Sequence, residues 1–131
     1  MLRGACLCGG VQFEADAEAT VAGTCHCSRC QRASGGAGVT GFLVPPDKFR
    51  VVAGEDLLGS YSDEGFTTRH HCTTCGSGVF GSSDQFVVAH AGCLEPGSAF
   101  QPQFHMMVDF KASWDEINDD LPQFGGMPPM G

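Results

Sequence analysis

Apolar and polar residues alternate over short stretches of the chain, which is the pattern of half-buried β-strands. Val11 and Phe13 alternate with Gln12 and Glu14, and a period of two turns one face of a strand toward a core. Other runs are rich in valine, leucine and phenylalanine and are bounded by turn-forming residues. These runs predict strands over residues 39–44, 57–61, 66–71, 86–91 and 104–111.

Helical patterns are scarce. Residues 47–49 predict one short helical turn, and residues 114–121 have a weakly helical pattern. A length of 131 residues suits one domain. We therefore expect a single mostly β domain over residues 1–124. A flexible C-terminal tail of Gly, Pro and Met is expected at residues 125–131.

The composition limits the cellular compartment and the classes of binding partner that we expect. No stretch of about 18 apolar residues exists, and the start MLRGACLCGG lacks the apolar run of a signal peptide. We therefore expect a cytoplasmic protein without a membrane partner, in which cysteines are metal ligands rather than disulfides. The 15 acidic against 7 basic residues argue against nucleic acid as a partner, since a polyanion needs a basic footprint.

Four of the eight cysteines form two close pairs, Cys6 with Cys8 and Cys72 with Cys75, and a glycine follows each pair. Zn²⁺ takes four ligands in a tetrahedron, and a close cysteine pair offers two thiolates to one ion. The trailing glycine permits the tight turn of a zinc knuckle. The two pairs predict one closed structural zinc site, in preference to buried core cysteines.

Three further cysteines, Cys25, Cys27 and Cys30, lie within six residues and have no adjacent fourth ligand. Three protein ligands with an exchangeable fourth position are typical of catalytic zinc. The spacing favours this open site over a closed one. The residues that could close it are one distant cysteine and the histidines, namely Cys93, His26, His70, His71, His90 and His105.

The order of these motifs resembles the glutathione-dependent formaldehyde-activating enzyme family, which includes centromere protein V. The resemblance runs from Gly4 to Phe124. It rests on GACLCGGVQFE at residues 4–14, CHCSRCQR at 25–32, RHHCTTCGS at 69–77, AGCLEP at 91–96, and LPQF at 121–124. Each motif alone is weak, and their joint order is specific.

The resemblance implies an Mss-four-like (β-tent) fold of antiparallel sheets with two Zn ions. It places the structural zinc on Cys6, Cys8, Cys72 and Cys75, and the catalytic zinc on Cys25, Cys27 and Cys30. It implies a carbon–sulfur lyase resembling S-(hydroxymethyl)glutathione synthase, which acts on an adduct of glutathione, or a similar thiol, with a small aldehyde such as formaldehyde. It assigns no catalytic or substrate-binding residue beyond the metal ligands.

Two other hypotheses remain. The family's centromere protein and the possible closure by Cys93 allow a non-catalytic, zinc-stabilised interaction module. A nucleic-acid ribbon is disfavoured by the acidic balance. For the enzyme, Arg29, Arg32 and Arg69 are scarce cations beside the motifs that could attract an anionic thiol, although solvation explains each of them more simply.

Overall fold

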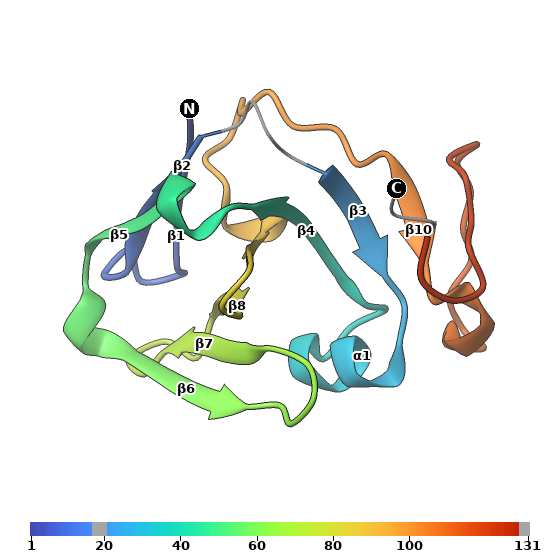
Figure 1. The fold of residues 1–131 in the computed structure, drawn as a ribbon, viewed down its shortest axis with the longest axis horizontal. Coiled ribbons are helices and arrows are strands. Elements are labelled where there is room, and N and C mark those ends of the chain that lie inside the picture. The colour runs from blue at the N-terminus through green and yellow to red at the C-terminus, as the bar shows by residue number, and fades with distance from the viewer. Residues whose placement is uncertain (17–20, 129–131) are drawn as a thin grey trace. The chain divides into compact units, whose positions relative to one another are not determined.

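The computed structural model describes residues 1–16 and 21–128 (Figure 1). The chain is mostly β, with 39% strand and 15% helix, and confirms the predicted fold class. The strands of the described part are β1 (Leu2–Ala5), β2 (Gln12–Ala15), β3 (Val21–Cys25), β4 (Val39–Val44), β5 (Phe49–Ala53), β6 (Leu58–Ser62), β7 (Thr68–Cys72), β8 (Gly78–Ser82), β9 (Val87–His90) and β10 (Phe104–Met106).

One α-helix, α1 (Ser28–Ser34), lies within the described ranges. The short 3₁₀ turns are η2 (Pro46–Lys48), η3 (Glu55–Leu57), η4 (Ala91–Cys93) and η5 (Val108–Phe110). The chain divides into two compact units. The first unit comprises Met1–Val21 and Phe42–Phe100, and the second comprises Ala22–Gly41 and Gln101–Gly131.

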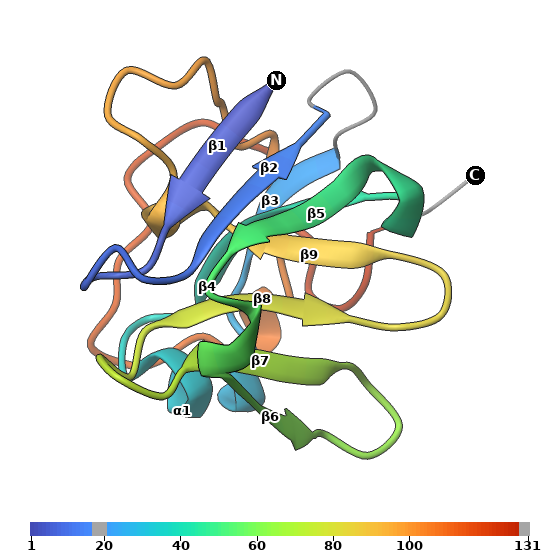
Figure 2. The same ribbon diagram turned by 90° about the vertical axis from the view of Figure 1, so that its left-hand side faces the viewer.

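The first unit contains a three-stranded antiparallel sheet in the order β1-β2-β5, which Figure 2 shows side by side. Leu2 pairs with Ala15 and Ala5 with Gln12, so β1 and β2 form a hairpin. The turn of this hairpin carries Cys6 and Cys8. Strand β5 pairs with the other edge of β2.

The rest of the first unit is an antiparallel meander in the order β9-β8-β7-β6. Strand β7 ends at Cys72, and the turn before β8 carries Cys75. Phenylalanines join this meander to the three-stranded sheet. The ring of Phe49 lies 5.2 Å from that of Phe13 and 4.7 Å from that of Phe80. Phe13 is buried, and burial of such rings supplies much of a small core's stability.

In the second unit β10 and β3 are neighbours, and β3 is followed in the sheet order by β4, of which residues 39–41 belong to this unit. Strands β10 and β3 pair in parallel, with Phe104 opposite Gly23 and Met106 opposite Cys25. The Phe104 ring occupies the space beside Gly23, where a Cβ would lie only 2.7 Å from the ring. Strand β3 leads directly into helix α1, so the second cysteine group lies at a strand-to-helix junction.

Most of the predicted strands are present, with shifted ends. Strand β4 matches its predicted range, and β6, β7 and β9 differ from theirs by one or two residues at an end. The predicted strand over 104–111 ends at Met106, because Met107 has a left-handed backbone (φ 59°) and η5 follows. Residues 114–121 are all described and form no helix, so the helix predicted there was wrong.

The reason for the missing helix lies in the residues themselves. The carboxylate of Asp119 accepts the N–H of Leu121 (3.1 Å), a local bond that competes with helical pairing. Pro122 then disfavours helical backbone at the preceding residue.

The chain divides into two compact units, and the prediction of a single domain over residues 1–124 stays a prediction. The carbonyl oxygens of Gly125 and Gly126 accept the N–H groups of Asp109 and Met107. Residues 129–131 of the predicted flexible tail lie outside the described residues. Across the described part, every helix is too short or too polar to cross a lipid bilayer.

The first unit offers a matched pair of glycines that tests its packing. Gly54 and Gly65 both have left-handed backbones (φ 77° and 79°), but only at Gly54 would a Cβ meet backbone, 2.1 Å from the Gly10 carbonyl oxygen. We expect Gly65→Ala to lower the free energy of unfolding by about 1 kcal/mol and Gly54→Ala to lower it by clearly more. Chemical denaturation measures both, and equal losses would contradict the described packing.

Candidate metal centres

The first unit brings four distant cysteines together. Cys6 and Cys8 come from the β1–β2 turn, and Cys72 and Cys75 come from the end of β7 and the turn after it. Their four Sγ atoms all lie within 4.8 Å of one another. The Cys6–Cys8 and Cys8–Cys72 Sγ pairs are 3.6 and 3.8 Å apart. The structure thus assembles the four residues that the sequence predicted.

Both turns have the backbone of a knuckle. The N–H of Gly9 donates to the Cys6 carbonyl (3.0 Å), and that of Gly76 donates to the Cys72 carbonyl (2.8 Å). Both glycines have left-handed φ angles, 79° and 81°, which other residues adopt at a cost. The trailing glycines therefore let each pair of cysteines fold back toward one point.

Hydrogen bonds stabilise two of these sulfurs as thiolates. The hydroxyl and N–H of Ser77 are the main cause that lowers the pKa of Cys75 to about 5. Burial acts to raise the pKa of Cys6. The Val11 N–H, 3.2 Å from its Sγ, and the thiols of Cys8 and Cys72 outweigh that effect, so the Cys6 pKa is lowered. Hydrogen bonding thus favours the thiolate form, which binds cations, at both sulfurs.

Cys8 shows the opposite effect. The N–H of Gly10 acts to lower its pKa, but Cys6 and the other sulfurs around it raise the pKa to about 11. Thiols this close cannot all ionise unless a cation offsets their repulsion.

The geometry of the four sulfurs fits zinc. Four sulfurs at about 2.3 Å from one Zn²⁺ in a tetrahedron lie about 3.8 Å from each other. The 3.6 and 3.8 Å separations of the Sγ atoms match that edge length. Together, the four sulfur donors and this spacing form a cage that could hold one metal ion of this size.

The second unit assembles Cys25, Cys27 and Cys30, whose Sγ atoms also lie within 4.8 Å of one another. Cys25 is the last residue of β3, and Cys27 is the N-cap of α1. The N–H of Cys30 donates to the Cys27 Sγ (3.3 Å), as in a capped helix start. The end of β3 and the start of α1 therefore bring the three Sγ atoms of Cys25, Cys27 and Cys30 together. We call this group the sulfur triangle.

Close packing holds the Cys25 backbone. A Cβ on Gly38 would lie 2.3 Å from the Cys25 carbonyl oxygen, so only glycine fits there without displacement. The hydrogen bond with Cys30, and then burial, raise the pKa of Cys25. This thiol, like Cys8, needs a cation nearby before it ionises with its neighbours.

The candidate metal-binding group of the second unit consists of three residues within the described part of the chain. The two histidines of this unit, His26 and His105, are hydrogen-bonded to each other, with 2.9 Å between His26 Nε2 and His105 Nδ1. Cys93 belongs to the first unit, where its Sγ donates to the Gly78 carbonyl (3.5 Å). Burial, and then the charges of nearby cysteines, raise the Cys93 pKa.

Sequence reasoning missed the environment of the histidine pair. His105 Nε2 lies 3.0 Å from both carboxylate oxygens of Asp119, and both histidines are buried. His26 and His105 are 79 residues apart. No spacing rule relates positions so far apart, although His26 does stand inside the Cys-x-Cys motif.

The candidate arginines fall into two groups. Arg29 and Arg32 lie on α1 beside the sulfur triangle. Arg69 instead bonds through Nε to the buried carboxylate of Asp63 in the first unit (3.2 Å). Arg69 therefore has a structural partner in its own unit.

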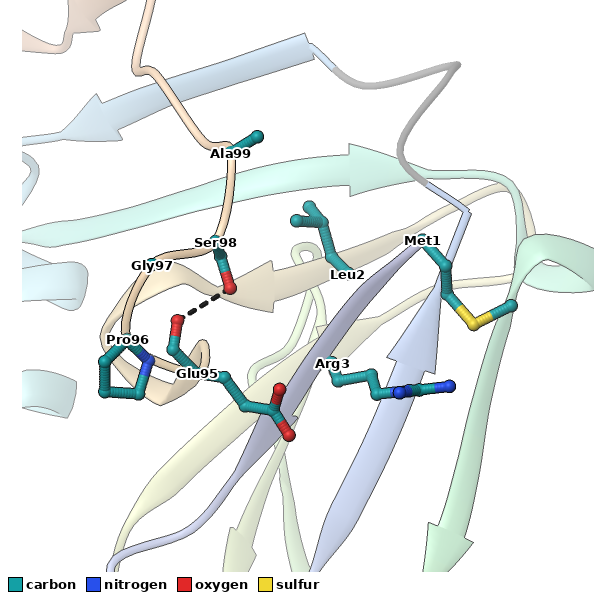
Figure 3. Close-up of a pocket in the computed structure, with 8 residues that line it drawn as sticks. All are labelled: Met1, Leu2, Arg3, Glu95, Pro96, Gly97, Ser98 and Ala99. Carbon is teal, nitrogen blue, oxygen red and sulfur yellow. Dashed lines mark hydrogen bonds between the residues drawn. The ribbon is translucent and has the colours of Figure 1, made fainter.

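A pocket of about 340 Å³ lies in the first unit between the start of β1 and the turn after η4 (Figure 3). It is lined by Met1, Leu2, Arg3, Glu95, Pro96, Gly97, Ser98 and Ala99. The Ser98 hydroxyl donates to the Glu95 carbonyl (2.7 Å), which closes the turn. The lining has no cysteine or histidine, so this pocket is separate from the two candidate metal centres.

The sequence and the fold were compared with those of known proteins. No curated protein matches the sequence. A crystal structure of a Rhodobacter sphaeroides protein superposes with a TM-score of 0.59 at 24% identity, over 74% of this chain and 91% of that one, and shows a shared fold. A model of the glutathione-dependent formaldehyde-activating enzyme family matches residues 1–109, which include all seven clustered cysteines. The chain therefore belongs to the glutathione-dependent formaldehyde-activating enzyme family.

Proposed function

We propose that this protein is a zinc-dependent carbon–sulfur lyase-type enzyme acting on the adduct of glutathione, or a similar thiol, with a small aldehyde such as formaldehyde. One observation carries the proposal. The first unit gathers four cysteine sulfurs, whereas the second gathers three. Three thiolates around one zinc leave a fourth position for an exogenous ligand, as in catalytic zinc sites.

The chemistry of that position follows from its ligands. Zinc bound there would hold the glutathione sulfur as a thiolate, which is the nucleophilic form. Cys25, Cys27 and Cys30 donate negative charge and so disfavour carbonyl polarisation as the main role. We therefore favour thiolate positioning over Lewis-acid activation of the aldehyde.

The reaction balances without a redox partner. The thiolate sulfur adds to the aldehyde carbon, the carbonyl π bond breaks, and its oxygen takes the proton that the thiol released. In reverse, the carbon–sulfur bond breaks and the aldehyde leaves. Arg29 and Arg32 on α1 would attract the carboxylates of glutathione in a protein with a formal net charge of −8.

The cage of Cys6, Cys8, Cys72 and Cys75 has a different role in this proposal. It would hold a structural zinc, because four protein thiolates leave no position for substrate. Cys8 and Cys72 are 64 residues apart, so the ion would tie the β1–β2 hairpin to the β7–β8 turn.

Loss of a ligand from the cage should unfold the protein. We expect Cys72→Ser to give an insoluble or unfolded chain, because the free energy of structural zinc binding is also folding free energy. Thermal melting with and without a strong chelator measures this. A folded Cys72→Ser protein with an unchanged melting temperature would argue against a structural zinc.

Loss of a ligand from the triangle should instead change thiol binding. We expect Cys27→Ser to stay folded, because the first site still holds the structure, and to lose the response of its metal to glutathione. Cobalt substitution makes that response visible in the absorption spectrum. A Cys27→Ser protein whose cobalt spectrum still responds to glutathione as the unmodified protein does would rule out the open site.

Cys93 distinguishes the enzyme from the interaction module. With the second site open, Cys93→Ala should keep two equivalents of metal and the glutathione response unchanged. If Cys93→Ala empties the second site, that site is a closed four-cysteine cage, and the non-catalytic module becomes the better account. Metal content measured by mass spectrometry separates the two results.

A further inference from the structure

A buried histidine, His26, lies between Cys25 and Cys27, and its ring is hydrogen-bonded to another histidine. The His26 side chain is only 4% exposed, whereas Cys25 and Cys27 on either side are half-buried. Cys25 ends a strand, and Cys27 has an extended backbone (φ −65°, ψ 159°). Alternate side chains of an extended chain point to opposite faces. Holding His26 on one face therefore sends both cysteines to the other.

His26 is held at three points. Its N–H donates to the Met106 carbonyl (3.0 Å), and its carbonyl accepts from the Gln31 side chain (2.8 Å). The third point is the ring, through the 2.9 Å bond between its Nε2 and His105 Nδ1. The Gln31 amide also donates to the Phe110 carbonyl (2.9 Å), so this tie extends from α1 to η5.

The direction of the ring bonds follows from Asp119. A carboxylate only accepts, so His105 Nε2 donates to it, and a neutral His105 then presents Nδ1 as an acceptor. His26 Nε2 must carry the hydrogen that Nδ1 accepts. The series Asp119–His105–His26 is thus a directed chain of hydrogen bonds.

The opposite nitrogen of His26 takes no part in this chain of hydrogen bonds. His26 Nδ1 is buried and has no hydrogen-bond partner in the described structure, and a carboxylate oxygen of Asp115 lies 3.6 Å away. The hydrogen bond of the ring is therefore made through Nε2. This asymmetry makes the role of the ring testable with side chains of different reach.

The anchor of His105 is itself fixed. Its N–H donates to the Pro122 carbonyl (2.8 Å), and its carbonyl accepts the N–H of Phe124 (2.9 Å). Asp119 also accepts the N–H of Leu121, which sets the orientation of its carboxylate. The segment that supplies these contacts lies beyond residue 109, where the family match ends.

We propose that His26, anchored through Nε2 by His105 and Asp119, is a positioning residue that pre-organises Cys25, Cys27 and Cys30 for metal binding. The inference rests on the proposed function, since it assumes that the triangle binds metal. It concerns geometry alone. Residues that orient metal ligands typically change metal affinity by about 10–100-fold when they are replaced.

The test compares two amides. A glutamine side chain carries its amide nitrogen near the position of a histidine Nε2, whereas asparagine reaches only as far as Nδ1. The full-length protein is titrated with Co²⁺ against a competing chelator, and thiolate-to-cobalt absorption reports the second site after the first has filled. We expect His26→Asn to weaken the second Co²⁺ by about 10–100-fold and His26→Gln to restore most of that loss.

The controls separate folding from positioning. His90→Asn replaces a histidine of the first unit and should leave the affinity for the second Co²⁺ unchanged. Asp119 is half exposed, so Asp119→Ala breaks the chain of bonds without removing either buried ring. Asp119→Ala should weaken the second Co²⁺ as well, while Asp119→Asn, which keeps an acceptor, should weaken it less. Asp119→Ala decides the question if His26→Asn does not fold.

Three outcomes decide between the ideas. If the unmodified protein binds no second Co²⁺, the proposed function fails, and the positioning role fails with it. If it binds a second Co²⁺ that responds to glutathione, but His26→Asn and Asp119→Ala bind it equally well, only the positioning role is overturned. An equal loss in His26→Gln and His26→Asn would also overturn it, because anchoring through Nε2 requires that the two differ.

Discussion

The mutual repulsion of crowded thiolates is the constraint on which the rest of the structure depends. Four sulfurs within 4.8 Å of one another cannot all carry charge without a cation between them. The pKa of Cys8 shows this repulsion, because the Gly10 N–H acts to lower it and yet the neighbouring sulfurs raise it to about 11. A divalent ion turns the repulsion into attraction. It would then link a hairpin and a turn that lie more than sixty residues apart.

The same constraint acts differently in the second unit. Three sulfurs around one zinc would leave its coordination incomplete, and the proposed function gives that position to an external thiolate. The junction of β3 and α1 forms the triangle from residues close in sequence, and more distant groups fix its orientation. Gly38 packs against the Cys25 carbonyl, and the histidine pair holds the residue between Cys25 and Cys27. In this account the first unit supplies stability and the second supplies chemistry.

Local sequence patterns predicted many of the strands and both cysteine clusters. The alternation around Val11 and Phe13 predicted the strand at β2. The close spacing of the cysteines predicted both clusters, and trailing glycines supported the first. Helix α1 was not predicted, because its seven residues have no apolar periodicity and bury only Cys30. The bond between His26 and His105 was not predictable either, since it depends on the parallel pairing of β10 with β3. At 114–121 a weak helical pattern lost to the local bonding of Asp119 and to Pro122.

The central claim is that one zinc site is closed and the other open, and X-ray absorption at the zinc edge tests it most directly. A fully loaded protein free of added thiol should show about 3.5 sulfur neighbours per zinc, the mean of the four- and three-cysteine clusters, with a light atom completing the second site. Addition of glutathione should raise that value to about four and remove the light-atom contribution. Four sulfur neighbours per zinc before glutathione is added, with no change afterwards, would contradict the account.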